Sequence, residues 1–153
     1  MKRLFACIMT LGVLLAGCGT DTSSDIAASV SAEDIFSTLT EAFPGVDLQS
    51  GDLVIKLLGV DPDSVLSCNA AFAKDGGPGM VIVLETNSED AALNASERMN
   101  YYLTTLQNSA AQYSPSDVAV LKNGYVYTSG PYAVLYVGED VEAAKKELAE
   151  LFH

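Results

Sequence analysis

The chain has 153 residues, of which 20 are acidic and 8 are lysine or arginine, so its formal net charge is −12 at pH 7. An acidic surface repels phosphate backbones and anionic lipid headgroups. We therefore expect no nucleic-acid partner and no attachment to membranes through a basic patch.

The N-terminal segment has the layout of a signal peptide. Lys2 and Arg3 precede an apolar run, Leu4–Leu15, and small residues then lead to Cys18. The run is roughly half as long as the ~20 residues that span a bilayer. It is therefore expected to be an export signal and not a permanent transmembrane helix.

The four residues Leu15-Ala16-Gly17-Cys18 look like the lipobox of bacterial lipoproteins. We expect cleavage before Cys18, a lipid on its thiol, and a location at the extracytoplasmic side of the cell membrane, which acyl chains would hold firmly. An ordinary secretory signal followed by a chance cysteine is the alternative. The predicted organisation is a signal peptide over 1–17, a lipidated cysteine and flexible tether over 18–30, and one domain over 31–153. Because Lys2 and Arg3 leave with the signal, the net charge would fall from −12 to −14.

The domain begins with a pattern typical of helices. Ser31 and Asp34 resemble a capping box, apolar residues then recur at helical spacing, and Pro44-Gly45 ends the helix. The other expected helices are Asp52–Leu58 with Gly59 as its C-cap, Ser88–Gln112 and Val141–Phe152, with one further turn at Ser116–Leu121. The short run Leu53–Leu58 could also be a strand, because periodicity does not separate the two over so few residues.

Four segments have the composition of strands: Val65–Phe72, Met80–Leu84, Tyr125–Ser129 and Tyr132–Val137. Met80–Leu84 is apolar on both faces and should be central. The segments predict an α+β fold: a two-layer sandwich with a mostly antiparallel four-stranded sheet and helices packed on one face.

The last two strands suggest a binding surface. A two-residue loop at Gly130-Pro131 places Tyr125, Tyr127, Tyr132 and Tyr136 on one side of the sheet. If helices cover the other side, these rings form an open face suited to a protein, peptide or glycan partner in the envelope. The alternative is that tyrosine simply favours half-exposed strand positions.

Residues that usually carry chemistry are scarce. The only histidine is His153, the last residue, so a histidine-assisted nucleophile and a zinc site are both disfavoured. Cys68 would be the one cysteine left and is expected to be a small buried hydrophobe.

Asp61-Pro62-Asp63-Ser64 lacks most calcium-loop ligands and is better explained as a turn. The glycine-rich segment 75–79 lacks the lysine of a phosphate-binding loop and is interpreted as a flexible strand connection. We therefore expect no metal and no cofactor.

From about Leu53 to Phe152 the chain resembles DUF4358, a family of bacterial lipoproteins with a domain of unknown function. The residues that carry the resemblance are Leu57 to Asp63, the strand Met80–Leu84, Tyr113-Ser114-Pro115, and Gly130-Pro131-Tyr132 leading into Val134 to Val137. Gly130-Pro131-Tyr132 departs from the more usual Gly-Asn-Tyr turn, which affects only the hairpin. The resemblance supports the lipoprotein address and implies no mechanism.

The sequence thus favours a membrane-tethered envelope lipoprotein with a non-catalytic binding or interaction domain. The alternative is an envelope hydrolase that uses acidic residues, because the separation of carboxylates cannot be derived from sequence.

Overall fold

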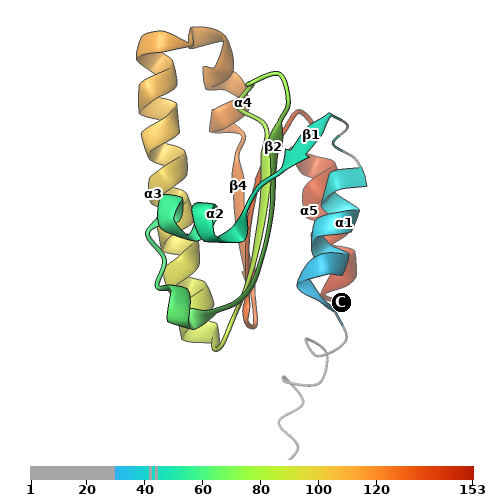
Figure 1. Ribbon diagram of the computed structural model, residues 1–153. Coiled ribbons are helices and arrows are strands. Elements are labelled where there is room, and N and C mark those ends of the chain that lie inside the picture. Colours follow the sequence, from blue (N-terminus) through green and yellow to red (C-terminus); the bar gives the residue numbers. More distant parts are fainter. Residues whose placement is uncertain (1–29, 42, 44) are drawn as a thin grey trace, which may run out of the picture.

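The computed structural model describes residues 30–41, 43 and 45–153. Its centre is a five-stranded antiparallel sheet in the order β1-β2-β3-β5-β4 (Figure 1). The strands are β1 (Val46–Leu48), β2 (Val65–Ala73), β3 (Met80–Thr86), β4 (Tyr125–Ser129) and β5 (Tyr132–Val137). The α+β class and the antiparallel pairing are confirmed, with five strands where four were expected.

The central position of β3 follows from its composition. Its run Met-Val-Ile-Val-Leu is buried throughout, and β2 and β5 pair with it on either side. A strand whose side chains are apolar in both directions must be covered on both faces. The prediction that Met80–Leu84 is a central strand is confirmed.

Helices cover both faces of the sheet, so the domain has three layers (Figure 1). The helices are α1 (Ala32–Glu41), α2 (Gly51–Leu58), α3 (Glu89–Tyr113), α4 (Val118–Lys122) and α5 (Val141–Leu151). Helices α2, α3 and α4 pack on one face, whereas α1 and α5 pack on the other. The expectation of a two-layer sandwich with helices on one face is wrong, because α1 and α5 each carry an apolar stripe that must also be buried.

The two faces have separate cores. The core under α3 contains Ile82, Leu84 and Leu135, together with Met99 from the helix. The core under α1 and α5 is formed mainly by Ile35, Leu39, Val81, Val83, Val134, Tyr136 and Leu148. Alternate residues of each strand thus enter opposite cores, as the pleat of a strand requires.

Strand β1 is an edge strand that the sequence did not reveal. Val46 pairs with Ala73 and Leu48 with Ala71, and the Lys74 amide donates to the Gly45 carbonyl at 3.0 Å. These contacts bring the segment after α1 beside the end of β2. None of the helices in the described part of the chain is long and apolar enough to cross a membrane.

Candidate functional site

The hairpin has the predicted register, but the tyrosine face is not open. Tyr125 faces Tyr136 and Ser129 faces Tyr132, so the four tyrosines do share one side of the sheet. That side is the one covered by α1 and α5: Tyr132 and Tyr136 are 4% and 1% exposed, and Tyr125 and Tyr127 are half-buried. The predicted open binding face is therefore wrong.

Two of the tyrosines have structural contacts. The rings of Tyr127 and Tyr132 pack on Phe152 just after α5, with centroids 5.6 and 5.9 Å away. The Tyr132 hydroxyl donates to the Val30 carbonyl at 2.6 Å. Burial raises the pKa of the Tyr132 phenol, and the carboxylates of Glu85 and Asp34 raise it further. Tyr132 thus fixes the start of the domain to the start of β5.

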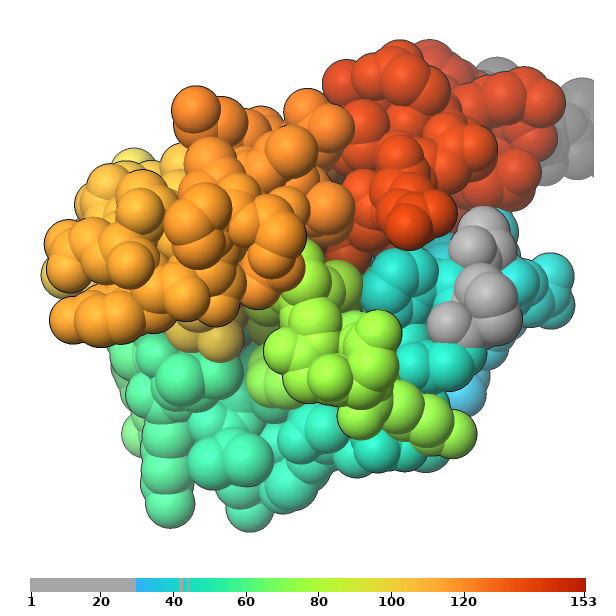
Figure 2. All heavy atoms as spheres, turned by 90° about the horizontal axis from the view of Figure 1, so that it is seen from above, coloured from blue at the N-terminus to red at the C-terminus, as the bar shows by residue number. Residues whose placement is uncertain are grey.

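A pocket of about 400 Å³ lies at the opposite end of β5. Seen from above, the surface is hollowed where the green loop between β2 and β3 meets the cyan and red segments (Figure 2). Its lining residues come from the loop regions at the ends of four strands and from α4: Phe43, Gly45, Ala73, Asp75, Gly77, Pro78, Gly79, Val120, Tyr136, Gly138, Glu139 and Asp140. We consider this pocket the candidate functional site.

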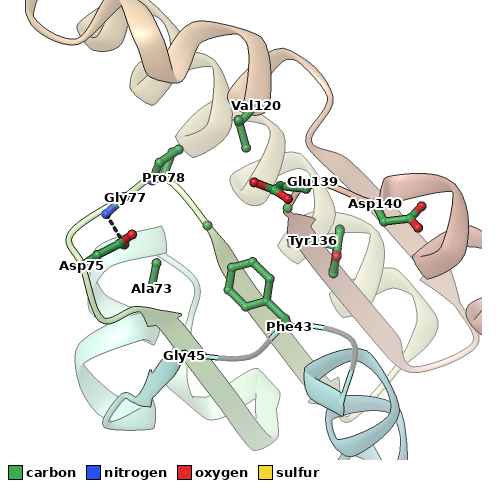
Figure 3. A pocket seen from close by; sticks show the side chains of 12 residues that line it. Phe43, Gly45, Ala73, Asp75, Gly77, Pro78, Val120, Tyr136, Glu139 and Asp140 are labelled. Carbon is green, nitrogen blue, oxygen red and sulfur yellow. Dashed lines mark hydrogen bonds between the residues drawn. The ribbon is translucent and has the colours of Figure 1, made fainter.

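The glycine-rich segment forms one wall of the pocket. The Ala73 amide donates to the Gly79 carbonyl at 2.9 Å, and the Asp75 carboxylate accepts the Gly77 amide at 2.9 Å (Figure 3). A Cβ on Gly79 would lie 2.2 Å from Cζ of Phe43, closer than side-chain carbons approach. Glycine is therefore needed there to seat the Phe43 ring. The segment does connect two strands, as expected, and it also shapes a cavity.

An aromatic pair lies at the centre of the site. Phe43 and Tyr136 meet edge to face, with centroids 6.3 Å apart and an interplanar angle of 69° (Figure 3). A Cβ on Gly138 would lie 2.6 Å from the Tyr136 hydroxyl, so glycine leaves room for that group. Burial raises the pKa of the Tyr136 phenol, and the carboxylates of Asp140 and Glu139 raise it further.

The Tyr136 hydroxyl is unusual because it has no hydrogen-bond partner among the described residues, although the residue is 1% exposed. Buried polar groups are normally paired with protein or with water. In the described part of the chain, no fully enclosed side-chain oxygen or nitrogen lacks a partner. Tyr136 lines the pocket, where a ligand or water can pair with its phenol oxygen.

The charged groups of the pocket are all acidic. Asp75 and Asp140 are already engaged, since Asp75 accepts the Gly77 amide and Asp140 caps α5 by accepting the Ala143 amide at 3.0 Å. Glu139 is exposed, and its carboxylate extends toward the glycine-rich loop (Figure 3). No lysine, arginine or histidine of the described residues lines the pocket. The site consequently has a negative potential.

The other residues considered from sequence do not assemble into a site. Nowhere in the described ranges do three or more histidine, cysteine, aspartate or glutamate side chains gather to hold a metal. Asp61 accepts the Asp63 amide at 3.1 Å and caps a 3₁₀ turn, Pro62–Ser64, as the turn interpretation predicts. His153 is exposed.

Cys68 is a half-buried thiol that packs against the core under α3. Burial raises the pKa of this thiol to about 11, with a further contribution from the Asp52 carboxylate. Because the thiolate is the nucleophilic form, such a thiol is poorly reactive near neutral pH. This agrees with the interpretation of Cys68 as a small packing residue. Cys18 and the rest of the lipobox lie outside the described residues, so lipidation stays a prediction.

A family model described as "Domain of unknown function (DUF4358)" matches residues 49–138, more than half of the chain. The chain belongs to this family. No curated protein and no solved structure matches it. The DUF4358 segment runs from just before α2 to Gly138, so α1, β1 and α5 lie outside it.

The DUF4358 segment supplies the glycine-rich wall and Tyr136, whereas Phe43, Glu139 and Asp140 flank it. Sequence reasoning missed the pocket because its walls are distant along the chain. The available signal was the pair of glycine-containing turns at the ends of β2 and β5. Whether two such strand ends lie together on an open sheet can be predicted only when the strand order is known.

Proposed function

We propose that the protein is a cell-envelope lipoprotein, tethered through a lipid on Cys18, that binds a small ligand in the pocket bounded by Phe43, the glycine-rich loop and Tyr136. The observation that carries the binding role is Tyr136, a buried residue that lines the pocket and whose hydroxyl has no hydrogen-bond partner among the described residues. A volume of about 400 Å³ is within the range of small-molecule sites.

The positions of Val30 and of the pocket support an outward-facing site. Val30, where the predicted tether ends, is bonded to Tyr132 at the start of β5, and Gly138 lines the pocket just beyond the end of that strand. Strands rise about 3.3 Å per residue, so the two ends lie roughly 20 Å apart. A domain held at Val30 would present its pocket away from the membrane.

Acid-based hydrolysis is the weaker alternative. A hydrolase needs two carboxylates free to act as acid and as base or nucleophile. In the pocket, Asp75 and Asp140 already accept backbone amides, which leaves Glu139 without such a partner. The arrangement favours recognition over catalysis.

Anchoring can be tested by growing an expressing bacterium with an alkyne-bearing fatty acid. The full chain should incorporate the label, remain in the membrane fraction, and be digested by protease added to cells stripped of their outer layers. Cys18→Ala should lose the label, because the thiol is the group that is acylated. Cys68→Ala is the matched control and should keep it. Equal labelling of the wild type and Cys18→Ala would reject the anchor.

A further inference from the structure

We infer that the pocket takes a small organic cation, an alkylammonium group whose N–H groups pair with the Tyr136 phenol oxygen and the Glu139 carboxylate. This inference rests on the proposed function, because it names the ligand class of the same pocket. Its basis is the chemistry of the lining.

The lining of the pocket is acidic. Among the described residues, Asp75, Glu139 and Asp140 line it, and no lysine, arginine or histidine does. Lys74 precedes Asp75 in the chain, but its Nζ lies 3.6 Å from the Asp47 carboxylate and it does not line the pocket. A carboxylate or phosphate ligand would meet uncompensated repulsion, whereas a cation would be attracted.

The Tyr136 hydroxyl, which has no partner among the described residues, can also interact with such a cation. A phenol oxygen can accept an N–H group as well as donate its own hydrogen. Hydrogen bonds from a charged donor are roughly twice as strong as neutral ones. Burial is the main cause of the raised pKa of the Tyr136 phenol, and the carboxylates of Asp140 and Glu139 raise this pKa further. The electric field of both carboxylates therefore reaches the phenol oxygen. The same field favours an ammonium at that position.

The lining suits an organic cation better than a metal ion. Calcium takes six to eight oxygen ligands, with carboxylates clustered around it. The described residues contain no cluster of three or more metal-binding side chains, and one pocket wall is the Phe43 ring. An aromatic wall suits the alkyl part of an amine, and an aromatic face attracts ammonium groups.

The experiment is an amide NMR titration of the full chain in detergent with three probes of matched length: n-butylammonium, 1-butanol and butyrate. We expect n-butylammonium to shift the amides of Gly77, Gly79 and Gly138 in a saturable manner. Its affinity should be at least about tenfold higher than that of either other probe, which corresponds to about 1.4 kcal/mol. Ionic strength is held constant, because screening alters such differences.

Two variants test the assigned contacts. Tyr136→Phe and Glu139→Gln should each weaken n-butylammonium binding several-fold. Tyr127→Phe removes a hydroxyl from the same face of the sheet but outside the pocket, and Glu89→Gln removes an acid at the opposite end of the domain. Both controls should bind as the wild type does. Glu139 is exposed, so its variant keeps the test valid even if Tyr136→Phe fails to fold.

The outcomes are distinct. If 1-butanol or butyrate shifts the same amides equally well, the pocket remains a binding site and the cation preference is wrong. If no probe shifts those amides, the proposed binding function is rejected with it. If Glu89→Gln weakens binding as much as Glu139→Gln does, the attraction belongs to the acidic surface as a whole and the inference fails.

Discussion

Tyr132 and Tyr136 lie on the same strand and the same buried face, yet their hydroxyls differ. The Tyr132 hydroxyl donates to the Val30 carbonyl at 2.6 Å, whereas the Tyr136 hydroxyl has no partner in the described part of the chain. A phenylalanine at either position keeps the ring and removes only the hydroxyl. The pair therefore separates a hydroxyl with a structural hydrogen bond from the one to which we assign ligand binding.

We expect Tyr132→Phe to lower the free energy of unfolding by about 1 kcal/mol, the usual contribution of one hydrogen bond. Tyr136→Phe should leave it unchanged or slightly raised, because no hydrogen bond to a described residue is lost. Urea denaturation of both variants measures the difference. A loss for Tyr136→Phe as large as that for Tyr132→Phe would show that the Tyr136 hydroxyl is already paired.

Cys68 should make stability depend on alkaline pH. Its folded pKa is about 11, above the ordinary value of 9.0, so between these values the folded chain binds more protons than the unfolded chain. The contribution of the protonated Cys68 thiol to the free energy of unfolding is complete below about pH 9 and is lost as the pH rises toward 11. Under reducing conditions, Cys68→Ser should therefore show a shallower decline in unfolding free energy over this interval. Parallel curves for the wild type and Cys68→Ser would contradict the assignment.

At the scale of elements, strands with strong local signals were predictable from sequence. The hairpin of β4 and β5 has the expected bounds and register because Gly130-Pro131 permits only a short loop between alternating segments. The continuous apolar run of β3 identified a central strand. Strand β1 was not predictable, since its three residues Val-Asp-Leu carry no periodic signal and pair only at an edge.

The layering and the pocket depended on long-range contacts. Ile35 and Leu148 show that α1 and α5 have apolar sides, but no local pattern says which face of the sheet they cover. The two helices lie on the tyrosine side of the sheet and bury the surface that was expected from the sequence to be exposed. The pocket similarly requires Phe43 to meet Gly79 and Tyr136, which lie far along the chain.

Helix α3 offers a test of capping at the scale of one element. The Ser88 hydroxyl accepts the Ala91 amide at 3.2 Å and caps the helix. Ser88→Ala should lower the free energy of unfolding by about 1 kcal/mol, because a free amide at the helix start loses its partner. Ser96→Ala is the matched control, since its exposed hydroxyl only donates to the Leu93 carbonyl within the helix. Ser96→Ala should be nearly neutral by urea denaturation, and equal losses for the two variants would contradict the capping role.

In the whole molecule, the sheet separates the two sites that the proposed function assigns to anchoring and to ligand binding. One end of β5 holds the start of the domain through Tyr132 and Val30, and the other end reaches the pocket at Gly138. The helices on both faces make the sheet a rigid spacer between them, because its strands are buried in two cores. If the proposed function holds, ligand binding and anchoring would thus not interfere with each other.

The protein as a whole is strongly acidic. The sequence carries 20 acidic residues against 8 basic ones. The ion pairs within the described residues join exposed side chains: Lys74 with Asp47, Lys145 with Glu142, and Lys146 with Glu150. Exposed pairs contribute little to stability, so repulsion among the remaining carboxylates should dominate the electrostatic energy of the folded state.

Added salt should therefore stabilise this protein at pH 7. Raising NaCl from about 10 mM to 150 mM shortens the screening length from roughly 30 Å to 8 Å. The melting temperature should rise by a few degrees, as about 1 kcal/mol of added stability produces in a domain of this size. The control is the same pair of salt concentrations at about pH 4, where carboxylates become protonated and the repulsion weakens. The salt effect should shrink there. A melting temperature that falls with salt at pH 7 would mean that attractive ion pairs, and not repulsion, dominate the surface.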